Sequence, residues 1–139
     1  MRFVFADTGY WIALIDPDDD LHDKALRVTA GLGDVTLVTS AFVLAEVLNH
    51  FSGYGPTYRR IAAVAVQTIS DNPKHAVFLH TDDFFDLAVA RYRQYSDKEW
   101  GLTDCYSFLL MEKERIYEAL AYDHHFQQAG FRALLREQG

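Results

Sequence analysis

The sequence predicts an α/β fold, a three-layer α/β/α sandwich with a mostly parallel central sheet. Short apolar runs alternate with longer segments of helical periodicity along all 139 residues, an order typical of α/β domains. The apolar runs show no clean alternation of polar and apolar residues, which indicates strands buried on both faces. Half of the residues are hydrophobic, enough for a core in a chain whose length fits one domain, residues 1–139.

Four apolar runs are predicted strands, and a fifth run is a candidate. The first run ends directly before Asp7, and the second is rich in β-branched residues and follows a Gly-Leu-Gly stop. The predicted strands are residues 2–6, 35–39, 75–80 and 119–122, with residues 131–135 as the fifth.

Helices are predicted between the strands from their caps and stops. Three consecutive aspartates favour the N-terminus of the first helix, and Ser40 is a suitable N-cap for the second. Pro56 lies near the start of the third helix, and Thr103 is a candidate N-cap for the fifth. The predicted helices span residues 21–32, 40–51, 56–70, 81–95 and 103–114, and a further helix joins the last two strands.

Charge and cysteine content narrow the possible functions. The chain has 20 acidic and 13 basic side chains, a net charge of −7. This charge argues against a passive nucleic-acid coat but not against a nucleic-acid enzyme with catalytic carboxylates.

Cys105 is the only cysteine, so we expect a reducing compartment. The N-terminal apolar run is too short for a signal peptide, and no stretch reaches the roughly 18 apolar residues of a membrane helix. We therefore expect a soluble, cytoplasmic protein without a membrane segment.

Four acidic residues lie where a parallel sheet places its chemistry, outside the carboxyl ends of the strands. Asp7 directly follows the first strand and Asp123 the fourth. Asp104 is the second residue of the predicted helix 103–114, and Glu46 lies two turns into an apolar helix. Carboxylates that meet in one pocket repel one another and need a cation, and oxygen ligands favour Mg²⁺ or Mn²⁺.

Each acid also has a purely structural interpretation. Asp7 is a possible cap for a following helix, and Asp104 near a helix start is favourable for the helix dipole alone. Asp123 suits a turn, and Glu46 suits an exposed helix face. Their joint placement at element junctions favours the metal site.

Four motifs, in order along the chain, resemble those of PIN-domain ribonucleases. They are Val-Phe-Ala-Asp-Thr-Gly-Tyr-Trp at 4–11, Thr-Ser-Ala-Phe-Val-Leu-Ala-Glu at 39–46, Leu-Thr-Asp-Cys-Tyr-Ser at 102–107 and Ala-Tyr-Asp-His-His-Phe at 121–126. A closing Phe-Gln-Gln-Ala-Gly-Phe at 126–131 also fits. The resemblance spans nearly the whole chain. It is greatest to VapC-type toxins of toxin–antitoxin pairs and their free-standing relatives.

The resemblance implies an endoribonuclease that hydrolyses RNA phosphodiester bonds with Mg²⁺ or Mn²⁺. Asp7, Glu46, Asp104 and Asp123 match the family's metal-binding positions, and Thr103 matches the hydroxyl residue beside the third acid. The resemblance also implies a homodimer and a small antitoxin that holds the toxin inactive. The aromatic content agrees with such interfaces, because ten Phe, eight Tyr and two Trp exceed what a small core hides.

From these residues we expect Asp7, Asp104 and Asp123 to hold one ion, with Glu46 completing or extending the site. The ion would lower the pKa of a bound water, the resulting hydroxide would attack phosphorus, and the 3′ oxygen would leave. Thr103 would orient a carboxylate or a water.

Two features depart from the resemblance. Gly101 stands where many relatives have serine, and residues 16–20 form an unusually acidic loop. Neither feature touches the four acids, so an active enzyme is expected.

RNA contacts are expected from the few basic and aromatic residues near the motifs. Arg59 and Arg60 follow a Gly-Tyr-Gly-Pro turn, and Lys98 and Trp100 precede the motif at 102–107. The alternative is that these cations, and two arginines of the helix 81–95, lie on solvated helix faces and that Trp100 packs in the core. That helix carries an apolar stripe that we expect to serve core and interface.

Other functions receive less support. Asp-Thr-Gly at 7–9 is also an aspartic-protease triplet, but those enzymes are all-β and follow the triplet with Ser or Ala rather than tyrosine. His124-His125 is a weak transition-metal signal, because adjacent side chains usually diverge. Cys105 beside an acid is expected to be core packing rather than a reactive thiolate. A non-catalytic metal- or RNA-binding module and a free-standing nuclease in RNA processing remain the alternatives.

Overall fold

The computed structural model describes residues 2–137, so Met1 and residues 138–139 of the predicted domain lie outside the described residues. At its centre is a five-stranded sheet in the order β3-β2-β1-β4-β5, in which every neighbouring pair is parallel. The strands are β1 (Arg2–Ala6), β2 (Val35–Ser40), β3 (His75–Phe78), β4 (Glu118–Leu120) and β5 (Arg132–Ala133). The predicted α/β class with a parallel sheet is confirmed.

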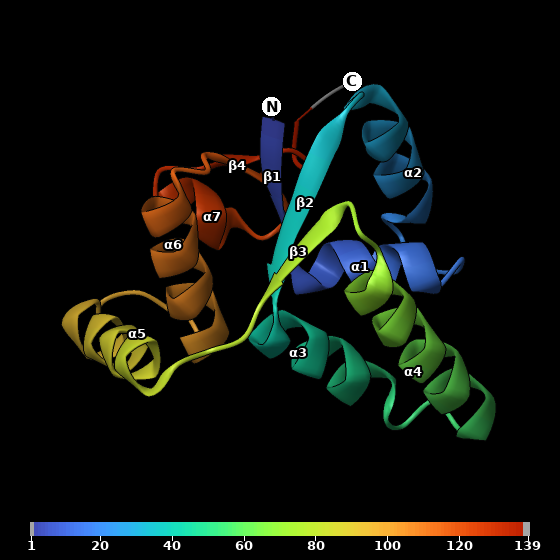
Figure 1. The fold of residues 1–139 in the computed structure, drawn as a ribbon, viewed down its shortest axis with the longest axis horizontal. Coiled ribbons are helices and arrows are strands. Elements are labelled where there is room, and N and C mark those ends of the chain that lie inside the picture. The colour runs from blue at the N-terminus through green and yellow to red at the C-terminus, as the bar shows by residue number, and fades with distance from the viewer. Residues whose placement is uncertain (1, 138–139) are drawn as a thin grey trace.

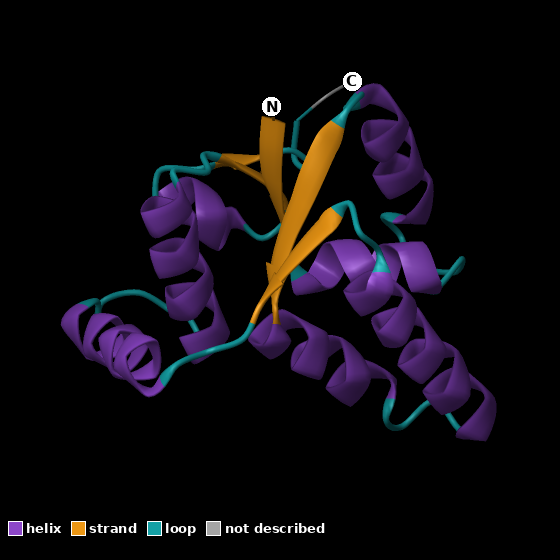
Figure 2. Cartoon of the chain, viewed as in Figure 1, coloured by secondary structure: helices purple, strands orange, loops and turns teal. Residues whose placement is uncertain are grey.

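Helices lie on both sides of this sheet, as Figures 1 and 2 show. Helices α1, α2 and α4 lie on one side of the strands and α5, α6 and α7 on the other, while α3 begins at the end of β2 (Figure 1). The helices are α1 (Thr8–Ile15), α2 (His22–Gly31), α3 (Ala41–Phe51), α4 (Pro56–Asp71), α5 (Asp82–Gln94), α6 (Leu102–Glu114) and α7 (His124–Gln128). The core fills the space between these layers.

Helix α1 has no counterpart among the predicted elements. It begins directly after Asp7, and Tyr10, Trp11, Ile12 and Ala13 in it are all buried. A helix that is apolar on every side shows no polar face, so the periodicity that reveals surface helices is missing from its sequence.

The start of α6 corrects the predicted cap. Gly101, rather than Thr103, is the N-cap, and the carboxylate of Asp104 accepts a hydrogen bond of 3.1 Å from the Gly101 backbone N–H. Asp104 is therefore the third residue of the helix rather than the second. The side chain of Asp104 reaches back to the first turn, which satisfies an amide that a hydroxyl cap would leave to water. Strands β3, β4 and β5 also end earlier than predicted.

The sheet topology positions the functional end of the molecule. From the central strand β1 the chain continues to β2 on one side, whereas β4 pairs with β1 on the other side. Ligands of parallel sheets bind at such a reversal of strand order, outside the carboxyl ends of the strands. Asp7 stands directly at this point, and its backbone N–H donates a hydrogen bond of 3.1 Å to the carbonyl of Leu120 in β4.

Candidate metal site

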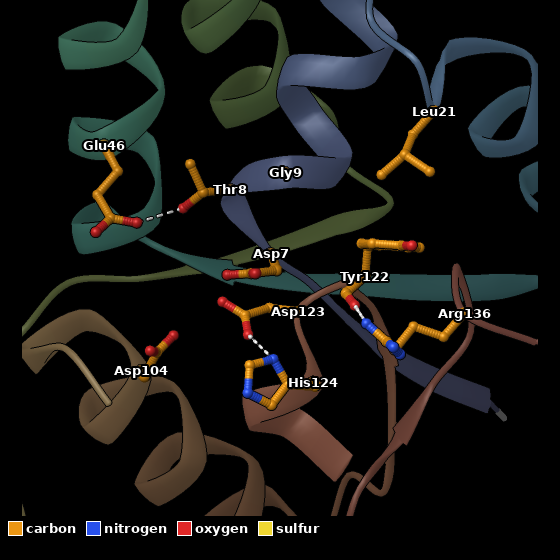
Figure 3. A pocket seen from close by; sticks show the side chains of 10 residues that line it. All are labelled: Asp7, Thr8, Gly9, Leu21, Glu46, Asp104, Tyr122, Asp123, His124 and Arg136. Carbon is orange, nitrogen blue, oxygen red and sulfur yellow. Dashed lines mark hydrogen bonds and ion pairs between the residues drawn. The ribbon is translucent and has the colours of Figure 1, made fainter. Parts of the chain in front are cut away.

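A cleft of about 560 Å³ lies at the carboxyl ends of β1 and β4 and is lined by all four predicted acids. Asp7 is the N-cap residue of α1, Asp123 is the N-cap residue of α7, Asp104 lies in the first turn of α6, and Glu46 lies in α3. Their side chains converge on one space from four separate elements (Figure 3). We call this space the acid cleft.

Asp7 is the most buried of the four acids, with 9% of its surface exposed. Burial, together with the charges of Asp104, Glu46 and Asp123, raises its pKa from the ordinary value of 3.8 to about 8, although a hydrogen bond from the Thr8 amide opposes the rise. Without a cation, the Asp7 carboxyl therefore carries a proton at neutral pH.

His125 connects two of the acids. Its Nδ1 lies 3.1 Å from Oδ2 of Asp104 and 3.2 Å from Oδ1 of Asp123. Both partners are carboxylate oxygens, so Nδ1 carries the proton and donates. The His125 backbone N–H donates to the same Asp123 oxygen at 3.0 Å. Within residues 2–137, the other oxygens, Asp104 Oδ1 and Asp123 Oδ2, have no hydrogen-bond or ion-pair partner and are available to a ligand.

Glu46 is oriented in the same manner by a different donor. The hydroxyl of Thr8 donates a hydrogen bond of 2.6 Å to Glu46 Oε1 (Figure 3). In the described part of the chain, Oε2 makes no such bond. Three of the four acids thus have one oxygen fixed by the protein and one oxygen available, an arrangement typical of metal ligands supported by a second layer of residues.

The acid cleft contains little positive charge. Among the described residues that line it, Arg136 is the only arginine or lysine, and its guanidinium donates to the carbonyl of Tyr122 at 2.8 Å and lies over the Tyr122 ring. Four carboxylates beside one arginine need a further cation. The available oxygens are hard ligands, so the residues present fit a divalent ion such as Mg²⁺ or Mn²⁺.

The prediction that the adjacent histidines diverge is wrong. The ring centroids of His124 and His125 lie 4.6 Å apart, and both Nδ1 atoms contact Oδ1 of Asp123, at 3.5 Å and 3.2 Å. The N-cap position of Asp123 explains this, because its carboxylate faces the first turn of α7, where both histidines lie. Ligand atoms of these three residues lie within 4.8 Å of one another, so nitrogen ligands border the acid cleft.

Three residues that line or support the site were not predicted from the sequence. Thr8 and His125 each stand within two residues of a predicted acid, and that proximity is the signal that could have identified them. Arg136 lies beyond the last motif and carries no such signal, because only the turn after β5 brings it to the cleft.

The remaining predicted residues lie outside the acid cleft. Thr103 is beside Asp104 on α6, where its carbonyl accepts a bond from Ser107, and it is not among the residues that line the cleft. Arg59 and Arg60 lie in the first turns of α4, and Arg59 donates to the Ser52 carbonyl.

Lys98 and Trp100 lie in the loop before α6. Trp100 is only 7% exposed, its indole N–H donates to Gln128 at 3.0 Å, and its ring packs against Tyr95 and Phe108. This placement agrees with core packing, and the ring also lines a hollow at the end of α5. The contact of Trp100 with RNA stays a prediction.

The burial of Cys105 confirms its predicted place in the core. Cys105 is fully buried, and burial together with the charge of Asp104 raises the pKa of its thiol, which disfavours a reactive thiolate. None of the helices in the described part of the chain has the length and apolarity needed to cross a bilayer.

Sequence and structure comparisons find close similarity to known proteins. Residues 4–132 match the PIN domain family. The 23S rRNA-specific endonuclease VapC20 of Mycobacterium tuberculosis, in strains CDC 1551 / Oshkosh and ATCC 25618 / H37Rv, is 33% identical over 131 residues, which cover 92% of this chain and 95% of the relative. A crystal structure of VapC20, described as a Sarcin-Ricin loop cleaving toxin, superposes with a TM-score of 0.84 at 29% identity, over 94% of this chain and 97% of that chain.

Proposed function

The chain belongs to the PIN-domain family, and from this premise we propose that it is a metal-dependent endoribonuclease and the toxin of a toxin–antitoxin pair. The observation that carries the proposal is the donor set of the acid cleft. Four carboxylates from four elements line one space, and three of them keep one oxygen available while the protein fixes the other. Capping roles explain one oxygen of Asp104 and one of Asp123, but they do not explain why all four carboxylates converge on one cleft.

In this proposal Asp7, Asp104 and Asp123 hold a divalent ion, and Glu46 extends the site. A bound Mg²⁺ or Mn²⁺ supplies a water of lowered pKa and offsets the charge of the phosphate. The Asp7 carboxyl must lose its proton to act as a ligand, so binding releases a proton and strengthens as the pH rises toward 8.

The surrounding residues position these carboxylates. His125 and the Gly101 amide fix Asp104, and the Thr8 hydroxyl fixes Glu46. We assign the orienting hydroxyl to Thr8 rather than to Thr103, because Thr8 contacts a carboxylate at 2.6 Å. Positioning of this kind avoids reorganisation of the ligands when the substrate arrives.

The substrate class and the partners follow from the relatives. VapC20 is a 23S rRNA-specific endonuclease, and we propose that this chain also cleaves RNA in the cytoplasm, with the sarcin–ricin loop as the first substrate to examine. We further propose a small antitoxin and a second copy of the chain as partners. Support comes from the similarity to VapC20, which is described as a toxin.

The test is cleavage of 23S rRNA and of a panel of structured RNAs with Mg²⁺, with Mn²⁺ and with EDTA. The wild-type protein is expected to cut at least one RNA only when the metal is present. Asp104→Asn should abolish cleavage, while Asp34→Asn, which changes an exposed acid outside the cleft, should not. Cleavage in EDTA, or by Asp104→Asn at the wild-type rate, would contradict the proposal.

A further inference from the structure

A second hollow, of about 440 Å³, lies at the end of α5 and in the loop that leads to α6. Its lining includes Tyr92, Arg93, Lys98 and Gly101, together with one acid, Glu99. We propose that this α5 hollow binds an unpaired nucleotide of the RNA substrate, next to the phosphate that is cleaved in the acid cleft. The inference rests on the proposed function. It adds a subsite that contributes to the affinity of the protein for RNA.

The first turn of α6 separates the hollow from the acid cleft and contributes residues to both. Gly101 lines the hollow, and its backbone N–H donates to the carboxylate of Asp104, which lines the acid cleft. A Cβ atom at Gly101 would meet no atom within 4 Å, so the backbone here borders open space. A strand of RNA can therefore pass from one space to the other over this turn.

The hollow offers positive charge that other contacts do not engage. Of the 13 basic side chains, seven are engaged elsewhere within the described chain, and the unpaired Arg27, Arg60, Lys74 and Arg115 lie outside both spaces. Arg2 and Arg132 pair with Glu118, and Arg91 pairs with Glu112. Lys24, Arg59 and Arg136 bind backbone carbonyls, and Lys113 lies over the ring of Phe84.

The two cations of the hollow remain available to a polyanion. Within residues 2–137, Arg93 has no hydrogen-bond or ion-pair partner. Lys98 pairs only with its neighbour Asp97, at 3.2 Å, and the Asp97 side chain is 71% exposed. Such exposed pairs contribute little stability, so a phosphate can replace the carboxylate. These cations line a hollow that adjoins, at Gly101, the acid cleft, whose own lining would repel RNA.

Aromatic rings supply the contact that a nucleobase needs. The Tyr92 side chain is 55% exposed and faces the hollow from α5. Tyr95 and Trp100 also line the hollow, and their rings pack against each other with centroids 4.9 Å apart. Unpaired bases of RNA stack on such exposed rings, while arginine and lysine contact the adjacent phosphates. The volume of the hollow lies in the range of small-ligand sites.

Equilibrium binding of RNA separates this subsite from catalysis. The probe is a fluorescein-labelled, single-stranded RNA of 12 nucleotides, bound to the full chain carrying Asp104→Asn, and the readout is fluorescence anisotropy across a salt series. Adding Arg93→Ala with Lys98→Ala should weaken binding about tenfold and reduce the slope of log K against log salt by about 1.4, because each phosphate neutralised on a single strand accounts for about 0.7. Adding Tyr92→Ala should weaken binding at least about fivefold, because the base no longer has a ring to stack on.

Matched controls use residues of the same type elsewhere on the surface. Arg27→Ala with Lys74→Ala removes two cations, and Tyr117→Ala removes a ring that is 64% exposed, none of which lines either space. These variants should bind as the parent does. A heparin oligosaccharide, which has phosphate-like charge but no bases, should respond to removal of the cations and not to Tyr92→Ala.

The outcomes distinguish this inference from the proposed function. If the hollow variants lose RNA binding, the subsite is supported, whether or not the wild-type protein cleaves the RNA. If all variants bind RNA equally, or none binds it, the subsite is overturned. Cleavage by the wild-type protein in that case would leave the proposed function intact.

Discussion

The carboxylates at the two ends of the central sheet have opposite surroundings. At the carboxyl ends of the strands, Asp7 and three other acids line a cleft whose described lining has a single arginine. At the amino ends, Arg2, Glu118 and Arg132 begin three neighbouring strands, and Glu118 accepts from both arginines at 2.9 Å. Arg132 also pairs with Glu137 at 2.7 Å.

The pKa values follow this difference. Burial raises the pKa of Asp7 and of Asp104, whereas hydrogen bonds from arginine lower the pKa of Glu118 and of Glu137. The amino end therefore uses its charges to fix β1, β4 and β5 to one another. The carboxyl end leaves one oxygen of Asp104, Asp123 and Glu46 without a partner in the described chain and buries Asp7 among them, which favours the proposed cation.

The largest effect is expected from neutralising the buried acid. Asp7→Asn should reduce metal-dependent cleavage by about a thousandfold or more. The same change should stabilise the metal-free protein, because an amide of similar shape cannot ionise in the buried position. Cleavage assays and thermal unfolding in EDTA measure the two effects.

The pH dependence of stability sharpens this prediction. The folded chain holds the Asp7 proton up to about pH 8, whereas the unfolded chain releases it near 3.8. The stability of the metal-free wild-type protein should therefore fall as the pH rises through this window. Asp7→Asn should flatten that slope, and a variant less stable than wild type at pH 8 would contradict the role of burial.

An intermediate effect is expected at His125, which contacts two acids through one nitrogen. His125→Gln should raise the metal concentration needed for cleavage by about 10–100-fold, the usual effect of removing a residue that orients a metal ligand. His125→Asn should have a much smaller effect, because the asparagine amide nitrogen occupies the position of Nδ1. Mn²⁺ titrations by calorimetry, with unfolding curves for both variants, provide the readout. Equal metal affinity in the two variants would argue against a positioning role.

The smallest effect is expected at the opposite end of the sheet. Glu118→Gln removes an acceptor for two arginines, and we expect a loss of about 1 kcal/mol and a few degrees in the unfolding midpoint at pH 7. The lowered pKa of Glu118 means that its stabilisation is present above about pH 4.5 and is lost as the pH falls further. The variant and the wild type should therefore converge at acid pH. Cleavage should not change.

Much of this architecture follows from the sequence because its signals are local. Parallel strands appear as apolar runs, and capping residues such as Ser40 and Thr81 mark helix starts directly, since each accepts a bond from an amide three residues later. Helix α1 escapes prediction because burial on every side removes its polar face. Strand ends escape because pairing with a neighbour, rather than composition, decides where a strand stops.

The sequence by itself determined the fold class, the order of the elements apart from α1, and the identity of the four acids, because these depend on patterns within a few residues of one another. Only the tertiary structure decided which donors fix those acids. His125 reaches Asp104 across 21 positions, and Thr8 reaches Glu46 across 38. It also decided that Trp100 is largely buried while Arg93 lines the α5 hollow. Such contacts depend on how separate elements meet at one edge of the sheet, which local propensity does not encode.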